Sequence, residues 1–379
     1  MSQLDSDFSQ KMPILGELTF LNHAGVAPIS GPAVEALHRY ADQASRYGNF
    51  QAPWYKRLKA IKRSAAELIH ARGAHEIAFI PNTSTGLALV AEGLGLKPGD
   101  NVIITDVEYP ANRYPWENLK ARGIDVIEVP QRDDNRIYAE DVCNAITDRT
   151  KVVSLSHVQY ASGFRIDPRP IADMVHHAGG YLCLDAIQSV GLLPVDVQSL
   201  GADFLVADGH KWMLGPEGAG FMYCHEDVIE KMHPAVVGWM NMVEAHDFGN
   251  YRFEFQRDAR RFEPGSYNVP GLLAMGASID MLLEVGIETV WSRVEALTAR
   301  LCEGLERKGY RLYSPRASEA ERSAIVIFEP PEGGEDATTI VNRLAEQQIV
   351  IVTRNGRLRA SPHFYNTIEQ MDALIEALP

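Results

Sequence analysis

The feature of this chain that most constrains its fold is the alternation of short apolar runs with amphipathic stretches between residues 76 and 224. The apolar runs have the length of buried strands, and they cover Glu76–Ile80, Asn101–Thr105, Asp125–Val129, Lys151–Ser156, Tyr181–Leu184, Asp203–Ala207 and Ala219–Cys224. Helical patterns separate them at Ser84–Leu94, Asn112–Arg122, Ala139–Thr147 and Pro170–Ala178. Strands that alternate with helices predict βαβ units and a mostly parallel, seven-stranded sheet covered on both faces. The predicted fold class is therefore α/β.

The pattern changes on both sides of this region. Two helical stretches, Pro32–Arg46 and Tyr55–His70, come before the sheet. After about Pro264, long helices alternate with few strands, which is typical of a smaller α+β domain. The helices are predicted at Pro270–Glu284, Glu288–Lys308, Asp336–Gln347 and Thr367–Leu378, and the strands at Ala324–Phe328 and Ile349–Thr353. We predict a large domain over residues 16–263 and a small C-terminal domain over residues 264–379, with residues 1–15 packing on the small one.

Composition and charge argue against several classes of partner. The formal net charge is −14, so the surface repels nucleic acid and anionic lipid, and neither is expected as a partner. Met1–Lys11 is polar and acidic and lacks the apolar region of a signal peptide. The longest uncharged run, Pro264–Ile279, is interrupted by Gly, Pro and Asn and is not expected to span a membrane. The cysteines are scattered without CxxC spacing, and we expect a cytoplasmic protein.

Polar side chains gather where five of the predicted strands end. In open α/β sheets, ligands bind beyond the carboxyl ends of the strands. These ends are followed by Thr83 and Ser84, by Glu108 and Tyr109, by His157, Gln159 and Tyr160, by Asp185 and Gln188, and by Asp208, His210 and Lys211. The sequence therefore predicts one site along this rim of the sheet.

Two residues of this rim predict the cofactor. Lys211 follows Gly209 and His210 in a turn, and Asp185 follows an apolar strand. A lysine amine can hold the aldehyde of pyridoxal phosphate as a Schiff base, and an aspartate can keep the pyridine nitrogen protonated so that the ring accepts electrons from a carbanion. The pair therefore predicts pyridoxal phosphate, with Lys211 and Asp185 as catalytic residues.

The other rim residues have a functional and an ordinary interpretation. Asn82–Gly86 opens a helix and can cradle a phosphate with its free N–H groups and hydroxyls, or it can be a simple helix cap. Tyr109 can stack on a heteroaromatic ring or lie half-buried in the core. Gln188 can donate to the phenolic oxygen of the cofactor, a task that Tyr160 can share. His210 can contact the phosphate or cap a turn.

Two arginines near the C-terminus are candidates for substrate binding. If residues 357–361 form a strand, Arg357 and Arg359 point the same way. An arginine there can bind a substrate carboxylate through two parallel hydrogen bonds. The alternative is a solvated strand edge.

Several common motifs are missing from the sequence. No GxGxxG follows a strand and opens a helix, which argues against a nicotinamide oxidoreductase, and there is neither a GxxxxGK[ST] loop nor an HExxH motif. His176 and His177 are adjacent, so they cannot face one metal from a helix as residues four apart can. We predict no metal site.

Taken in order, these motifs resemble the class V aminotransferase family. The family has fold type I of pyridoxal phosphate enzymes and includes cysteine desulfurases, selenocysteine lyases, isopenicillin N epimerase-like proteins and several transaminases. The resemblance runs from Phe20 to Thr367 through Thr83-Ser84, Glu108 to Asn112, His157 to Gly163, Asp185 with Gln188, Gly209-His210-Lys211, Phe262 to Ser266, and Arg359-Ala360-Ser361. It implies a fold type I large domain with a smaller α+β C-terminal domain.

The resemblance also implies roles for single residues. Lys211 would carry the cofactor, Asp185 would face the pyridine nitrogen and Gln188 the phenolic oxygen. The phosphate would be held by Thr83, Ser84 and His210, with Tyr109 stacked on the ring and Tyr160 nearby. Arg359 would bind the substrate carboxylate, with His23 and Arg357 as further candidates for the substrate pocket. Ser266 would reach the phosphate in the neighbouring subunit, which implies a homodimer with shared active sites.

Three departures from the desulfurase pattern stand out. Desulfurases carry a nucleophilic cysteine on a loop before the carboxylate arginine, whereas residues 353–359 hold none and no cysteine follows Cys302. Tyr109 replaces a histidine used for proton transfer. Asp208 replaces a serine near the phosphate, and we expect it to point away or to pair with an arginine. These changes argue against a desulfurase for iron–sulfur clusters.

The expected activity is therefore an enzymatic reaction at Cα of a small amino acid. Arg359 would hold the carboxylate, and Lys211 would take the α-proton as general base. We predict transamination, with a β-lyase or an amino-acid epimerase as the alternative within the family. A non-catalytic scaffold of the same fold is the alternative outside it, and the intact pair of Asp185 and Lys211 argues against that.

Overall fold

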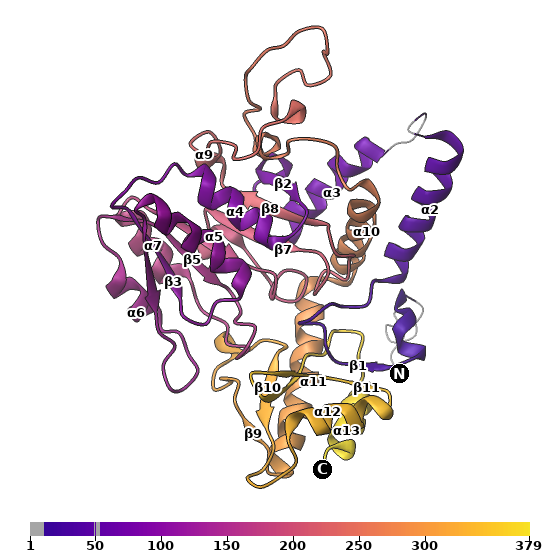
Figure 1. The fold of residues 1–379 in the computed structure, drawn as a ribbon. Coiled ribbons are helices and arrows are strands. Elements are labelled where there is room, and N and C mark those ends of the chain that lie inside the picture. The colour runs from indigo at the N-terminus through magenta and orange to yellow at the C-terminus, as the bar shows by residue number, and fades with distance from the viewer. Residues whose placement is uncertain (1–10, 49, 51–53) are drawn as a thin grey trace.

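The computed structural model describes residues 11–48, 50 and 54–379. Figure 1 shows a large central sheet with helices on both sides and a smaller C-terminal unit below it. The predicted packing of residues 1–15 therefore lies mostly outside the described residues. Within them, the short turn Pro13–Gly16 leads into strand β1 (Thr19–Phe20).

The central sheet has seven strands in the order β2-β8-β7-β6-β5-β3-β4. They are β2 (Ile77–Ile80), β3 (Asn101–Thr105), β4 (Asp125–Val129), β5 (Thr150–Ser156), β6 (Tyr181–Asp185), β7 (Phe204–Asp208) and β8 (Gly220–Cys224). The pairs from β4 to β7 are parallel, and β8 pairs antiparallel with β7 and β2. Every residue of β2, β3, β7 and β8 is buried, as expected for strands covered on both faces. The predicted mostly parallel, seven-stranded α/β sheet is confirmed.

The helices around the sheet follow the predicted pattern with one exception. They are α2 (Gly31–Tyr47), α3 (Trp54–Leu68), α4 (Thr83–Gly93), α6 (Ala139–Ala145) and α7 (Arg169–His177). The helix predicted over residues 112–122 is wrong, because this stretch breaks into three short pieces at Pro110–Asn112, Tyr114–Glu117 and Asn118–Arg122. Pro110 and Pro115 lack the amide hydrogen that a continuing helix needs, so each one begins a new turn.

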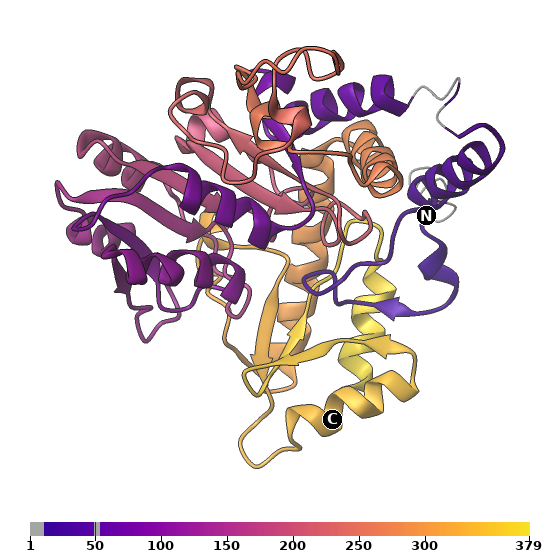
Figure 2. The ribbon, with the colours of Figure 1, turned by 45° about the horizontal axis from the view of Figure 1, so that its top comes forward.

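The C-terminal unit is built on a second, antiparallel sheet of four strands in the order β12-β13-β10-β9. The strands are β9 (Arg311–Leu312), β10 (Val326–Glu329), β12 (Val352–Arg354) and β13 (Arg357–Ala360), flanked by α12 (Ala337–Glu346) and α13 (Ile368–Ala377). The strand predicted over residues 349–353 divides in two, because β11 (Ile349–Val350) pairs with β1 whereas β12 pairs with β13. Figure 2 shows β1 beside this unit. Its partner strand β11 comes more than 300 residues later in the sequence.

Two long helices link the sheets. Helix α10 (Val269–Val285) packs against α2 and α3, and α11 (Ile287–Arg307) packs against α13. The two meet at Gly286 with a bend of 81°. The packing of α10 on the large unit supports a domain boundary near Gly286 rather than at Pro264, and we propose that boundary. No single helix among the described residues is long and apolar enough to cross a membrane, although α10 and α11 together pass by length and composition alone.

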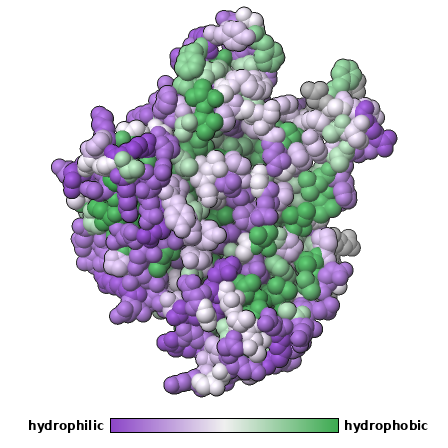
Figure 3. All heavy atoms as spheres, in the orientation of Figure 1, coloured by the Kyte–Doolittle hydropathy of each residue, from purple (hydrophilic) through white to green (hydrophobic). Residues whose placement is uncertain are grey.

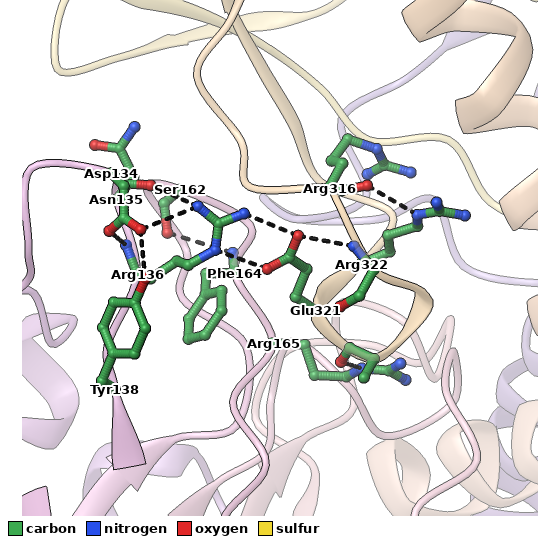
Figure 4. A network of polar contacts seen from close by, with 12 residues as sticks. Asp134, Asn135, Arg136, Tyr138, Ser162, Phe164, Arg165, Arg316, Glu321 and Arg322 are labelled. Atoms are coloured by element: carbon green, nitrogen blue, oxygen red, sulfur yellow. Dashed lines mark hydrogen bonds and ion pairs between the residues drawn. The ribbon is translucent and has the colours of Figure 1, made fainter. Parts of the chain in front are cut away.

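Polar contacts tie the two units together beside the large sheet. Arg136 donates from Nε and Nη2 to the two carboxylate oxygens of Glu321 at 2.8 and 3.0 Å (Figure 4). Arg165 donates to the backbone carbonyls of Glu319 and Ala320, each at 2.6 Å. The small unit is thereby held at a defined position relative to the strand ends.

A long segment after β8 projects from the large unit at the top of Figure 1. It contains only short helical turns between residues 230 and 268 and carries apolar side chains outside the core. Those with large exposed areas are Val236, Val237, Trp239, Phe248, Tyr251 and Phe253. Figure 3 shows green, hydrophobic residues on this projection among white and purple ones.

Candidate active site

The predicted rim of the sheet forms one pocket of about 530 Å³. Strand ends of the large sheet supply its floor, and the β12–β13 hairpin of the small sheet supplies a wall. The pocket is lined by the following predicted site residues: Thr83, Ser84, Tyr109, Tyr160, Asp185, Gln188, His210, Lys211 and Arg359. The structure thus brings together groups from both units, as a cleft between an α/β sheet and a second domain typically does.

Asp185 and Lys211 lie at the ends of the adjacent strands β6 and β7. Burial raises the pKa of Asp185 to about 7 and lowers the pKa of Lys211 to about 8, and the charge of each residue partly offsets the shift of the other. Lys211 Nζ lies 5.6 Å from the centre of the Tyr109 ring. A lysine whose pKa is near 8 is a nucleophile and a base at neutral pH, which an unperturbed lysine is not.

The start of α4 supplies an anion-binding end of the pocket. Asn82 caps this helix by accepting from Thr85 N–H at 2.8 Å, so the helix-cap interpretation is correct. Thr83 Oγ1 is buried and has no hydrogen-bond partner in the described chain. Cap and cradle are compatible, because the cap satisfies one N–H group and leaves the others at the helix start open to a phosphate.

Asp208 does not behave as expected from the sequence. Its side chain is 3% exposed and lines the pocket, so it does not point away. Its partner is not an arginine but His210, whose Nδ1 lies 3.0 Å from Asp208 Oδ2 in ion-pair range without alignment for a hydrogen bond. Asp208 is the last residue of β7 and His210 follows two residues later, so both side chains reach the same side of the chain.

Gln188 and the two tyrosines are held in defined orientations. Gln188 Oε1 accepts from the Trp212 indole at 2.8 Å, and its Nε2 donates to the Ala24 carbonyl at 3.1 Å. This arrangement fixes which end of the amide is the donor and leaves one N–H free. Tyr109 is 47% exposed and meets Tyr160 edge to face, with ring centroids 5.1 Å apart. Its ring face is therefore available for stacking.

Arg359 lies on β13 with a side chain that is 1% exposed. It donates to Asn22 Oδ1 at 3.0 Å and to the Tyr160 carbonyl at 3.4 Å, while its Nε has no partner. Burial, followed by the charge of Arg354, lowers its pKa to about 9. A buried guanidinium with an open donor and no carboxylate partner in the described chain is suited to bind a substrate carboxylate.

Three predicted residues lie elsewhere. Arg357 shares a strand face with Arg359, but its cross-strand neighbour Glu329 accepts from its Nε at 2.5 Å and holds it outside the pocket. His23 is fully buried behind the pocket, where it contacts the Ser361 carbonyl at 2.8 Å. Neither Arg357 nor His23 lines the pocket, which argues against the predicted role of each residue in substrate binding. Ser266 lines a separate cavity, and its role toward a neighbouring subunit stays a prediction.

Arg354 lines the pocket and was not identified from the sequence. It precedes Asn355 and Gly356, which turn the chain with φ values of 48° and 76°. Asn-Gly is the strongest short signal for a two-residue hairpin turn, and such a turn pairs Arg354 with Arg357. The Asn-Gly sequence is therefore the signal that predicts Arg354 beside Arg357 and Arg359.

Glu108 anchors the segment that carries Tyr109. Its buried carboxylate accepts hydrogen bonds from Thr105 Oγ1, Asn112 Nδ2, Ser156 N, Ser156 Oγ and Gln159 Nε2. A buried carboxylate with this many donors joins the ends of β3 and β5. Tyr109 therefore projects from a fixed base rather than from a free loop.

The unpaired polar atoms test whether the predicted cofactor fits. Buried polar atoms in proteins are nearly always hydrogen-bonded, so Thr83 Oγ1 and Arg359 Nε mark positions where a bound molecule would complete the site. A phosphate satisfies the first and a carboxylate the second. Together with the Lys211 amine and the open face of Tyr109, these residues fit pyridoxal phosphate with an amino acid beside it.

Comparison with known proteins gives consistent matches along the whole chain. The family described as Aminotransferase class-V matches residues 19–374. A probable cysteine desulfurase of Halalkalibacterium halodurans is 32% identical over 95% of this chain and 92% of its own length. An uncharacterized aminotransferase of Bacillus subtilis, YcbU, is 26% identical over 100% of this chain and 98% of its own. The apo cysteine desulfurase of Thermococcus onnurineus superposes with a TM-score of 0.88 at 25% identity, covering 98% and 96% of the two chains.

Proposed function

Since this chain belongs to the aminotransferase class-V family and its cofactor is pyridoxal phosphate, we propose that it transaminates a small amino acid. The family and the fold type I architecture expected from the motifs are confirmed. The observation that carries the proposal is the content of the pocket: one basic amine, Lys211, and no thiol. All four cysteines lie in the described part of the chain, and none of them lines the pocket.

The residues of the pocket divide the binding tasks. Thr83, Ser84 and the start of α4 would hold the phosphate, with His210 beside them. Asp185 would keep a proton on the ring nitrogen, and Gln188 would direct its free N–H toward the phenolic oxygen. When bound, pyridoxal phosphate supplies an electron sink and carries the amino group between substrates.

Lys211 and Arg359 would handle the substrate itself. Arg359 binds the α-carboxylate through its open Nε and a second nitrogen, which fixes the orientation of the Cα–H bond. Lys211 Nζ then removes the α-proton and holds it. In transamination, one base takes the proton from Cα and then returns it to a neighbouring atom. A single amine with a pKa near 8 can both accept and release a proton at neutral pH.

A β-lyase is the second candidate, and the names of several relatives favour it. A desulfurase that passes sulfur through a protein persulfide requires a thiolate at the site. Here the β12–β13 hairpin turns in two residues at the point where desulfurases carry their cysteine loop. Elimination without a protein-bound persulfide is therefore the form of this alternative that the residues allow.

A single turnover separates these reactions. The purified protein, loaded with pyridoxal phosphate, is mixed with L-amino acids in the absence of an oxo acid, and the cofactor is then extracted. Transamination leaves pyridoxamine phosphate and a matching oxo acid. Unchanged pyridoxal phosphate with an amino acid that has been cleaved or inverted would replace the proposal with a lyase or an epimerase.

The homodimer expected from the family stays a proposal with two supporting features. Ser266 lies outside the pocket of its own chain, in a second cavity lined by Pro81 and Gly218, whose chain neighbours Asn82 and Glu217 line the pocket. The projecting segment around Tyr251 exposes apolar side chains that a second subunit would cover (Figure 3). Sedimentation of the purified protein measures its mass in solution, and a monomer at micromolar concentration would contradict the proposal.

A further inference from the structure

We propose that Arg354 binds a second acidic group of the substrate, so that the amino acid turned over at this site has a short acidic side chain. The inference rests on the proposed function, because it names the substrate class of the same pocket. The inference is based on three arginines of one hairpin, of which one is paired with a carboxylate of the chain and two line the pocket.

The hairpin register places these arginines on one face of the small sheet. Arg354 pairs directly with Arg357, and Val352 pairs with Arg359. Residues directly opposite each other on paired strands project to the same face, and so do residues two apart on one strand. Arg354, Arg357 and Arg359 therefore begin on the same side of the hairpin.

The chain itself neutralises only one of the three. Glu329 accepts from Arg357 Nε at 2.5 Å and from Arg311 Nε at 2.7 Å, so this single carboxylate already serves two guanidinium groups. The Arg357 guanidinium also stacks on Tyr313, 3.8 Å from the ring centre. Arg357 is thus fully engaged away from the pocket.

Arg354 and Arg359 have no such partner. Among the described residues, Arg354 donates to the carbonyl of its neighbour Thr353 at 3.1 Å and has no carboxylate in ion-pair range. Arg359 donates only to neutral oxygens. The two charges are close enough that Arg354 contributes to lowering the pKa of Arg359. An anion that binds between two mutually repelling cations in a partly closed pocket stabilises both of them.

Two of the three acids that line the pocket have a base nearby on the large unit. Asp185 interacts with Lys211, and Asp208 lies beside His210. The third acid, Glu217, also lines the pocket, but it is exposed and belongs to the large unit. The cofactor phosphate is expected at the start of α4, on the large unit, whereas Arg354 stands on the hairpin of the small unit beside the carboxylate arginine.

These observations define the ligand by its charge. An α-carboxylate neutralises Arg359 and leaves Arg354 unpaired. A second carboxylate, or a sulfinate or phosphonate of the same charge, would neutralise Arg354. A planar carboxylate also matches the fork of the guanidinium group. The side chain must be short, because Arg359 lies only two residues beyond Arg357, the cross-strand partner of Arg354, and such diagonal neighbours are about 7–8 Å apart.

The test is a binding measurement on the protein loaded with pyridoxal phosphate. Maleate, which has two carboxylates, and propionate, which has one, are titrated while the absorbance of the bound cofactor is followed. We expect maleate to bind more tightly than propionate. Arg354→Gln should weaken maleate about 10- to 100-fold, since a hydrogen-bonded charge is lost, and should change propionate by no more than about threefold.

Arg357→Gln is the matched control, because it removes the cross-strand neighbour of Arg354 from the same hairpin. It should leave both dissociation constants within about threefold of the parent protein. Maleate binding no better than propionate, or losing affinity equally in both variants, would overturn the proposal. Circular dichroism and cofactor content establish that each variant is folded and loaded.

The outcome is separable from that of the proposed function. Binding of maleate requires no turnover, so it stands if the reaction proves to be elimination. A single turnover with L-aspartate, L-glutamate and L-alanine completes the test. Pyridoxamine phosphate formed from L-alanine but from neither acidic amino acid would contradict the inference while leaving transamination intact.

Discussion

The floor and the wall of the pocket carry their charges in opposite ways. The floor, by which we mean Asp185, Asp208, His210 and Lys211 at the ends of β6 and β7, sets each acid beside a base. The wall, formed by Arg354 and Arg359 of the β12–β13 hairpin, has two cations and no acid. The acids of the floor thus have bases of the same chain beside them, whereas the cations of the wall have no carboxylate partner among the described residues. We therefore propose that the floor holds the cofactor and that the wall selects the substrate by its charge.

The largest effect should come from removing Lys211, the proposed general base of the floor. Lys211→Ala removes the amine that we propose takes the α-proton, and we expect turnover to fall by roughly 100- to 10,000-fold. Binding of maleate by the wall should remain within about threefold of the parent protein, because Arg354 and Arg359 are untouched. Lys97→Ala, on the exposed surface, is the control. Undiminished turnover of amino acids by the Lys211 variant would refute the role of this residue.

A smaller effect should follow from removing the charge of Asp208, which lies beside His210 in the floor. Asp208→Asn keeps the shape of the side chain but removes the charge that lies 3.0 Å from His210 Nδ1. If Asp208 keeps His210 oriented toward the phosphate, pyridoxal phosphate should bind about tenfold more weakly. Pyridoxal, which lacks the phosphate, should bind unchanged. Tighter binding of the phosphate form would mean that repulsion by Asp208 outweighs the orientation of His210.

The smallest effect concerns the layer of histidines between floor and wall. His363 contacts the Trp212 carbonyl at 3.0 Å, next to Lys211, and His23 contacts the Ser361 carbonyl, next to the hairpin. Burial lowers the pKa of His363 to about 4 and that of His23 well below its usual value. These neutral histidines stabilise the fold above pH 6.5, and their contribution is lost as the pH falls toward 4.

Thermal unfolding of the cofactor-free protein should show this loss. The melting temperature should decrease by a few degrees between pH 7 and pH 4.5, in proportion to the protons taken up on unfolding. Asp185 acts in the opposite direction, since its raised pKa favours the folded state at low pH and that stabilisation disappears as the pH rises through about 7. Asp185→Asn should therefore make the decrease steeper. A melting temperature that rises on acidification would contradict the assignment of neutral buried histidines.

The floor of the pocket could be predicted from the sequence because its residues follow buried strands. Strand ends of a parallel sheet meet at one edge, so the order of Asp185 and Lys211 along the chain also determines their neighbourhood. The strand boundaries of the large sheet differ from prediction by a residue or so, because each short apolar run is bounded by polar, glycine or proline residues. The helix predicted over residues 112–122 is broken at Pro115, because proline lacks the amide hydrogen that a continuing helix needs.

The wall could not be predicted in the same way, because its charges are sorted by neighbours distant in sequence. Alternation along β13 places Arg357 and Arg359 on one face, but it does not reveal that Glu329 of β10 captures the former. Nor does it reveal that Arg354, across the turn, faces the pocket. Asp208 is a similar case, since its partner depends on how the turn after β7 orients two side chains.

The two-residue turn at Asn355 and Gly356 makes the hairpin a natural insertion point. Both positions are exposed, and a longer loop grafted there would extend over the pocket mouth from strands that are already paired. Lengthening an exposed connection costs little free energy, about 0.6 kcal/mol for each doubling of its length. A thiol delivered on such a graft would arrive next to Arg354 and Arg359 without altering the floor. We therefore expect the reach of this hairpin to be one determinant of whether the scaffold can pass sulfur through a protein thiol.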